Sequence, residues 1–460
     1  MAFRGDFLPG SSPVLPLLPV SSPDASLTAG QAPPSASQQL LPPAVDAKKP
    51  AMTQMFSSLS YPQFRLFWLS NLIVAMGLMV QVVAQRWLVV QLTDSALLLG
   101  LVSGVWAVTF ALSSVPMGLA ADRSNRRNLL LIGSVAALAI TLIVAVLVAA
   151  SIIEVWHVLA AGAIGGVLFA LRVPAGQAMT ARLVPPKDLM NAISLNQTAH
   201  SLPSVAGPAA GGVLVGLIGV AGAYFLTSGA LFIGILLMLG VAASFGRIRR
   251  ATRTSAGADL SEAIDYLRSH KDLLLLTAAM LIPFILGQSY VLLLPLFVEK
   301  ELGLGPVAFG VLSACLGAGS VLGALSVAAF GKERHLGFLM FAGVVATGAA
   351  AIVYGLSGSV LLVGAVLFVA GAGESALFAA YETVLLIRLP DEIRGRVLGL
   401  MFTLVAMFPI GAVAAGGAAD AFGLRAVAVG EGILIIPMAF VAWVLVFRDA
   451  SARCVGAQDP

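Results

Sequence analysis

The chain is a series of long apolar runs separated by short polar loops, beginning near Leu66 and ending near Phe447. Each run has roughly 20 to 28 residues, and about 20 apolar residues in a helix cross the hydrocarbon core of a bilayer. Twelve runs are predicted, at 66–91, 97–120, 128–151, 157–180, 189–216, 222–246, 273–298, 306–330, 336–356, 360–387, 397–419 and 426–447. Because lipid cannot bond backbone amides, each run should be helical. The pattern predicts an all-α polytopic membrane protein with twelve transmembrane helices.

Composition and charge refine this prediction. Hydrophobic residues make up 59% of the chain and charged residues only 10%, outside the range of soluble domains. All lysines and arginines except Arg86, Arg172, Lys300 and Arg425 fall in the two tails or in the even-numbered loops. The positive-inside rule therefore predicts that both termini are cytoplasmic. The net charge of +4 serves this topology, and no nucleic-acid partner is predicted.

The two halves of the chain share features at a constant offset in sequence. The pair Gly211-Gly212, late in the fifth run, corresponds to Gly416-Gly417, late in the eleventh. Two six-helix halves joined by a cytoplasmic linker are typical of secondary transporters whose substrate site lies between the halves near mid-membrane. The predicted segments are a disordered cytoplasmic tail, an N-terminal bundle, a linker, a C-terminal bundle and a second cytoplasmic tail, at 1–62, 63–246, 247–272, 273–447 and 448–460.

The sequence lacks the signatures of catalysis and of metal binding. Its two cysteines, Cys315 and Cys454, lie in a span and in the C-terminal tail, without metal-ligand spacing. The sequence has no cluster of histidines, no nucleophile elbow and no phosphate-binding loop. We therefore predict that the chain is not an enzyme and has no metal and no cofactor.

Two motifs carry a resemblance to a known family. The segment GLAADRSNRR at 118–127 resembles the signature between spans two and three of the major facilitator superfamily. The segment VAGPAAGG at 205–212 resembles the span-five element associated with exporters and antiporters. Further stretches, such as LPDEIRGRVLGL, are similar to the enterobactin-exporter-like branch, the transmembrane secretion effectors. The resemblance implies the major facilitator fold, two pseudo-symmetric six-helix bundles.

The resemblance also implies a role for each motif. The first would be a gating latch on the cytoplasmic side and the second an antiporter-type element. The gating residues would be Gly118, Asp122, Arg123, Arg126 and Arg127, and the antiporter-type residues Gly207, Pro208, Gly211 and Gly212. The simpler interpretations are orientation by positive charge for the first motif and close packing of small residues for the second.

Ionisable residues inside the spans are candidates for a transport pathway, because a charge at mid-bilayer costs roughly 2.5–3.5 kcal/mol on insertion scales. Glu374, at the midpoint of span ten, is the candidate proton-carrying carboxylate. The resemblance implies that spans one, four, seven and ten line one space, which would gather Glu374 with Arg86, Arg172 and Gln288. Alternatives remain open: Arg86 snorkels outward, Arg172 is structural, or Glu374 forms a static salt bridge.

Other polar and aromatic residues complete the candidate set. Gln81 and Gln85 share one face of span one, and Phe378 and Tyr381 lie close to the candidate carboxylate along span ten. Each is a candidate substrate contact, and helix packing is the alternative role. Glu431, near the start of span twelve, is expected to be solvated.

These features predict a secondary active transporter of the bacterial cell inner membrane. The predicted activity is proton-coupled export of a small amphiphilic molecule, such as a siderophore or a drug-like compound, by alternating access. The predicted partners are the substrate, protons and the lipid bilayer, and the predicted state is a monomer. An importer or a lipid-type flippase of the same fold is the alternative, and a passive channel is a third class.

Overall fold

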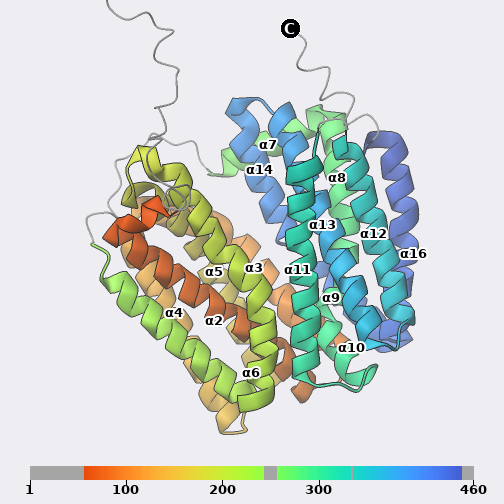
Figure 1. The fold of residues 1–460 in the computed structure, drawn as a ribbon, viewed down its shortest axis with the longest axis horizontal. Coiled ribbons are helices and arrows are strands. Elements are labelled where there is room, and N and C mark those ends of the chain that lie inside the picture. Colours follow the sequence, from red (N-terminus) through yellow and green to blue (C-terminus); the bar gives the residue numbers. More distant parts are fainter. Residues whose placement is uncertain (1–55, 243–255, 333–334, 448–460) are drawn as a thin grey trace, which may run out of the picture. The chain divides into compact units, whose positions relative to one another are not determined.

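The residues that the structure describes fold into helices joined by short loops, with no strand among them (Figure 1). This computed structural model describes residues 56–242, 256–332 and 335–447, all within one unit, Met52–Pro460. The first half comprises η2 (Ser57–Ser60), α2 (Pro62–Leu92), α3 (Ala96–Arg123), α4 (Arg126–Ala149), α5 (Val155–Leu183), η3 (Pro186–Asp188) and α6 (Leu189–Leu239). The second half comprises α7 (Ala256–Ser269), α8 (Lys271–Gly287), α9 (Ser289–Leu292), α10 (Leu294–Lys300), α11 (Pro306–Phe330), α12 (Leu336–Leu356), α13 (Val360–Arg388), α14 (Asp391–Val405), α15 (Pro409–Phe422), α16 (Leu424–Ala442) and the π-helix η6 (Trp443–Phe447).

The predicted apolar runs correspond closely to these helices. Within the described residues, eleven segments are long and apolar enough to cross a membrane. Twelve runs give eleven segments because α6 contains two of them, and its backbone leaves the helical region at Gly219 (φ 72°, ψ 175°). Glycine adopts this left-handed φ without steric cost, so the chain can end one crossing and begin the next there. The predicted all-α fold with twelve transmembrane helices is confirmed.

Two predicted spans are broken. The run at 273–298 is divided among α8, α9 and α10, and the run at 397–419 between α14 and α15. Pro295 and Pro409 stand in the first turns of α10 and α15, where the missing proline N–H costs no helical hydrogen bond. Broken helices are typical of transporter spans that line a binding region.

The loops gather at two ends of the antiparallel helices. One set, at 124–125, 184–188 and 389–390, lies beside most of the arginines, and we call this the arginine-rich end. The other set, at 93–95 and 301–305, marks the opposite end.

The two halves share a core at the opposite end. Most contacts between them come from two helix pairs, α3 with α15 and α6 with α11, and smaller ones join α2 with α10 and α3 with α9 and α7. The largest buried cluster draws on both halves and includes Trp87 and Phe309, whose rings stack with centroids 6.3 Å apart. The two clusters nearer the arginine-rich end, which include Leu183 and Leu389 respectively, each belong to one half. The described halves therefore share a core at one end and have separate cores at the other.

Many large apolar side chains on the outside of the helices are exposed. Leu112, Leu217 and Leu361 are 74%, 76% and 83% exposed. Water would disfavour so much exposed apolar surface, whereas the hydrocarbon of a bilayer covers it.

The start of the N-terminal bundle differs from the predicted tail at 1–62. Residues Ser57–Ser60 form η2, and α2 already begins at Pro62. Tyr61 Oη donates to Asp188 Oδ2 at 2.7 Å, and Ser57 Oγ donates to Oδ1 at 3.1 Å. The prediction of a disordered tail is wrong for residues 57–62, because these bonds tie η2 to η3 across the loop before α6. Residues 1–55, 243–255 and 448–460 lie outside the described part of the chain.

The described part of the predicted linker consists of the helix α7 and the first residues of α8. Its Ala263 and Leu267 are buried against the C-terminal half, and its Glu262 forms an ion pair with Arg396 of α14. The linker helix thus packs on the second bundle.

Candidate transport site

A cavity of about 230 Å³ lies inside the N-terminal half. Helices α2 to α6 all contribute to its walls, which are mainly apolar. Small residues open this space: a Cβ on Gly165 would stand 3.6 Å from Trp106 Cδ1, and one on Gly133 would stand 3.6 Å from Leu171 Cδ2. Its lining residues all belong to one half, whereas the sequence predicted a site between the halves.

Three predicted pathway residues line this cavity, namely Gln81, Gln85 and Arg172. Gln81 and Gln85 are four residues apart on α2, so both face the same side of that helix. Gln81 Oε1 accepts a hydrogen bond from Thr141 Oγ1 at 3.2 Å. Arg172 Nη2 donates to Asn71 Oδ1 at 3.5 Å, at the upper limit of hydrogen-bond distance. The cavity therefore combines apolar walls with a few polar groups, as small-molecule sites do.

Aromatic rings form one wall. Trp106 of α3 and Phe169 of α5 line the cavity, with ring centroids 5.3 Å apart, and Phe110 stacks on Trp106 at 5.6 Å. Phe169 precedes Arg172 by three residues, so both side chains lie on the same face of α5. A planar apolar group and a cationic group thus stand about one helical turn apart.

Glu374 lies in the other half, in a separate cavity of only about 10 Å³ lined also by Pro283, Phe284 and Thr347. That volume is about the space that one water occupies. The two cavities share no lining residue. Glu374 and Arg172, which the resemblance placed around one space, thus line two different cavities in this structure, one in each half.

The remaining candidates lie elsewhere. Arg86 is half-buried on α2 and forms no ion pair within the described residues, and Gln288 lies at the break between α8 and α9. Phe378 contacts Phe402, with ring centroids 6.0 Å apart. Tyr381 is completely buried, and its hydroxyl donates to Thr277 Oγ1 at 2.8 Å. This burial favours packing over substrate contact for Tyr381.

Glu431 corrects a further expectation. Its side chain was expected to be solvated, but it is only 7% exposed, and its Oε2 has no hydrogen-bond partner among the described residues. It faces Ser289 and Tyr290. The expectation is wrong because α16 turns this position toward the broken helix α8–α10 and away from the nearby loop.

The gating motif forms the end of α3 and the start of α4. Asn125 caps α4 by accepting from the backbone amides of Arg127 at 3.1 Å and Asn128 at 3.4 Å. Arg127 Nη2 donates to the carbonyl of Leu239 at 2.8 Å, so it satisfies an acceptor at the end of α6. A Cβ on Gly118 would meet no described atom within 4 Å. Asp122 and Arg123 also belong to the predicted latch, but their side chains lie outside the described set. The structure therefore describes an anchor within one half, through Arg127.

The antiporter-type motif packs in two directions. A Cβ on Gly207 would stand 2.3 Å from Met79 Cβ, and one on Gly211 would stand 3.0 Å from Val83 Cβ, so these two glycines admit α2. Gly212 faces the other half instead, where its Cβ would stand 2.6 Å from Gly310 Cα. The corresponding pair of the second half, Gly416-Gly417, also contacts the first half. A Cβ on Gly416 would stand 2.4 Å from the carbonyl oxygen of Ala96.

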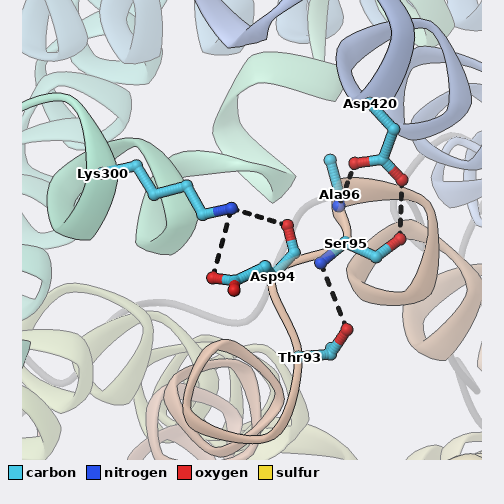
Figure 2. A network of polar contacts seen from close by, with 6 residues as sticks. All are labelled: Thr93, Asp94, Ser95, Ala96, Lys300 and Asp420. Atoms are coloured by element: carbon cyan, nitrogen blue, oxygen red, sulfur yellow. Dashed lines mark hydrogen bonds and ion pairs between the residues drawn. The ribbon is translucent and has the colours of Figure 1, made fainter.

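A polar network links the two halves at the opposite end (Figure 2). Asp420, at the end of α15, accepts from Ser95 Oγ at 2.6 Å and from the backbone amides of Ala96 at 2.7 Å and Leu97 at 3.1 Å. A carboxylate at a helix N-terminus meets free N–H groups and the positive end of the helix dipole.

The same network has a second cross-half link. Lys300 Nζ donates to the carbonyl of Asp94 at 2.8 Å and lies 3.2 Å from its carboxylate (Figure 2). Sequence reasoning missed Asp420, Ser95 and Lys300. The available signal was Ser95 directly before an apolar run, a typical N-cap position.

The family described as transmembrane secretion effector matches residues 53–457. The multidrug efflux pump Tap of Mycolicibacterium fortuitum is 26% identical over 387 residues, 80% of this chain and 91% of that protein. The staphyloferrin A transporter of Staphylococcus aureus is 26% identical over 275 residues, 60% of this chain and 66% of its own.

Solved structures agree at the level of the fold. A bacterial homologue of the human lysosomal transporter Spinster, in an inward-facing and unoccupied conformation, superposes with a TM-score of 0.67 at 15% identity, covering 89% of this chain and 99% of its own. The nucleoside transporter NupG gives 0.68 at 11% identity, with 83% and 98% covered.

Two six-helix halves, of which the N-terminal one contains a partly polar cavity, define a membrane transporter of the major facilitator fold. The chain belongs to the transmembrane secretion effector family of that superfamily.

Proposed function

We propose that this protein exports a small amphiphilic molecule in exchange for protons, as a monomer in a bacterial inner membrane with both termini in the cytoplasm. The observation that carries the proposal is the cavity of about 230 Å³, with its aromatic wall and its few polar groups. Its size is slightly below the usual range of ligand pockets and favours a drug-like compound over a bulky siderophore. Tap and the multidrug resistance protein MdtG of Enterobacter lignolyticus, 26% identical over 300 residues, support export of such compounds.

The arrangement of the halves supports alternating access. With the arginine-rich end in the cytoplasm, the shared core and the Asp420 network close the extracytoplasmic side, while the halves keep separate cores on the cytoplasmic side. Glu374 is the proposed proton carrier, since it is a half-buried carboxyl group at mid-span and forms no ion pair within the described residues.

Uptake of fluorescent drugs into inverted membrane vesicles tests the proposal. We expect uptake to require an imposed pH gradient and to be lost in Glu374→Gln. Glu382→Gln, about two turns along the same helix, is the matched control and should retain uptake. Uptake that does not depend on the pH gradient would contradict proton coupling. Accumulation only in right-side-out vesicles, or movement of labelled lipid instead of drug, would favour the importer or flippase.

A further inference from the structure

The cavity of the N-terminal half contains one cationic side chain. Among its described lining residues, Arg172 is the only charged group, and none is acidic. The other polar side chains, such as Gln81, Gln85 and Thr141, are neutral. The cavity therefore presents a single positive charge to whatever occupies it.

Within the described residues, Arg172 has almost no hydrogen-bond partner. A guanidinium carries five N–H donors, yet the one hydrogen bond of this side chain within the described residues is the 3.5 Å contact to Asn71. Asn71 in turn donates to Asn196 Oδ1 at 3.3 Å, so it is held in place from α6. No described carboxylate forms an ion pair with Arg172. A charge removed from water is costly unless it is paired, and an anion in the cavity would supply that pair.

The walls define the rest of the ligand. Trp106 and Phe169 offer aromatic faces about one turn of α5 from Arg172, and the glycines on α4 and α5 leave the space between the helices open. A guanidinium matches a carboxylate with two parallel hydrogen bonds, which a neutral amide cannot reproduce.

We propose that this cavity binds small amphiphilic organic anions, with a planar apolar body against Trp106 and Phe169 and a carboxylate held by Arg172. The proposal rests on the proposed transport function for its biological meaning and narrows its substrate class. Binding itself is measured without transport, so the two stand or fall separately.

The test uses the purified full-length protein in a neutral detergent, with 2-naphthoate and its uncharged analogue 2-naphthamide as probes. Equilibrium dialysis and thermal unfolding compare the wild type with Arg172→Gln and Arg172→Lys. Arg65→Gln, an exposed arginine on α2, is the matched control for lost charge. We expect the wild type to prefer naphthoate by roughly tenfold or more, the usual scale of a hydrogen-bonded charge.

The variants decide the outcome. Arg172→Gln should bind both probes equally, Arg172→Lys should keep part of the preference, and Arg65→Gln should keep all of it. If Arg172→Gln does not fold, the lysine variant carries the comparison through its intermediate preference. An unchanged preference for naphthoate in the folded variants, or no naphthoate binding by the wild type, overturns the proposal. Gradient-driven efflux of neutral drugs alone would support the proposed export function and contradict the anion site. Naphthoate binding without any transport would support the anion site and contradict the proposed export function.

Discussion

Gly212 of α6 and Gly310 of α11 approach each other across the two halves so closely that neither has room for a methyl group. A Cβ on Gly212 would lie 2.6 Å from Gly310 Cα, and one on Gly310 would lie 2.6 Å from Gly212 Cα. Real Cβ contacts are not so short, and the atoms in the way are backbone, so the helices themselves would have to separate. The conformation closed at this end therefore depends on both glycines.

Gly212→Ala should consequently disfavour the closed end. Overpacking of this kind costs about 1–3 kcal/mol, and each 1.4 kcal/mol changes a conformational ratio about tenfold. We expect transport in vesicles to fall about tenfold or more, with normal amounts of folded protein. Gly229→Ala is the control, because nothing lies within 4 Å of its Cβ position. Wild-type transport by Gly212→Ala would show that the contact is incidental.

Asp420→Asn tests the role of the Asp420 carboxylate, which belongs to α15 and accepts hydrogen bonds at the N-terminus of α3. The carboxylate accepts three hydrogen bonds across the halves, but Asp420 is exposed, so we expect a loss of about 0.5–1 kcal/mol after solvent screening. The opposite end should open two- to fivefold more often. A cysteine at Ala415, buried in the core shared by both halves, should then react faster with a maleimide in a Cys315→Ser, Cys454→Ser background.

Two further variants calibrate that result. Ser95→Ala removes only one of the three bonds and should give a smaller increase in labelling. Asp420→Leu removes all three and should give the largest. Equal labelling rates across this series would mean that the network does not hold the end closed.

The ion pair of Lys300 and Asp94 should matter less and should depend on salt. The Asp94 side chain is 91% exposed and that of Lys300 37% exposed, and pairs in such surroundings contribute less than about 1 kcal/mol. Lys300→Met should raise labelling at the same cysteine less than Asp420→Asn does. In the wild type, 1 M salt should reproduce most of that rise, because it shortens the screening length to about 3 Å. An effect of Lys300→Met that persists unchanged at high salt would contradict an electrostatic role.

The sequence predicted the positions of the helices well, but it predicted less well which side chains lie near each other. Runs 306–330 and 336–356 match α11 and α12 residue for residue, because apolar length alone determines a lipid-spanning helix. The turn at Gly219 lies between the predicted runs at 189–216 and 222–246, whereas the breaks in the run at 273–298 depend on packing around the chain. Membrane depth directed attention to Arg172 and the two glutamines, which line one cavity, and their role in transport stays a prediction. Depth does not reveal which way a helix face turns, and Glu374 lines a different cavity from Arg172.

Tyr61 offers a pH-dependent test outside the spans. Its hydrogen bond to the Asp188 carboxylate raises the pKa of the Tyr61 phenol above the ordinary value of 10, since the neutral phenol is the donor; partial burial and the nearby negative charge act in the same direction. A raised pKa means that the bond is fully present below pH 10 and is lost as pH rises through the higher folded value. Difference absorbance titration of wild type against Tyr61→Phe should show this late phenolate. In Asp188→Asn the titration should move back toward pH 10, and a midpoint that stays in place would contradict the assigned cause.

Gly133→Leu should test whether the cavity of the N-terminal half sets the size of the substrate. A Cβ at this position meets only Leu171 Cδ2, at 3.6 Å, so a side chain can start there without displacing backbone. The added carbons of leucine would then occupy part of the 230 Å³. We expect efflux of larger drugs to fall strongly while the smallest substrates are still exported, and thermal stability to change by less than about 1.5 kcal/mol because a void is being filled. Gly229→Leu adds the same side chain at an exposed position on α6 and should leave the substrate range as it is. A uniform loss for drugs of every size would indicate distortion of the helices, and an unchanged range would place the substrate in another part of the protein.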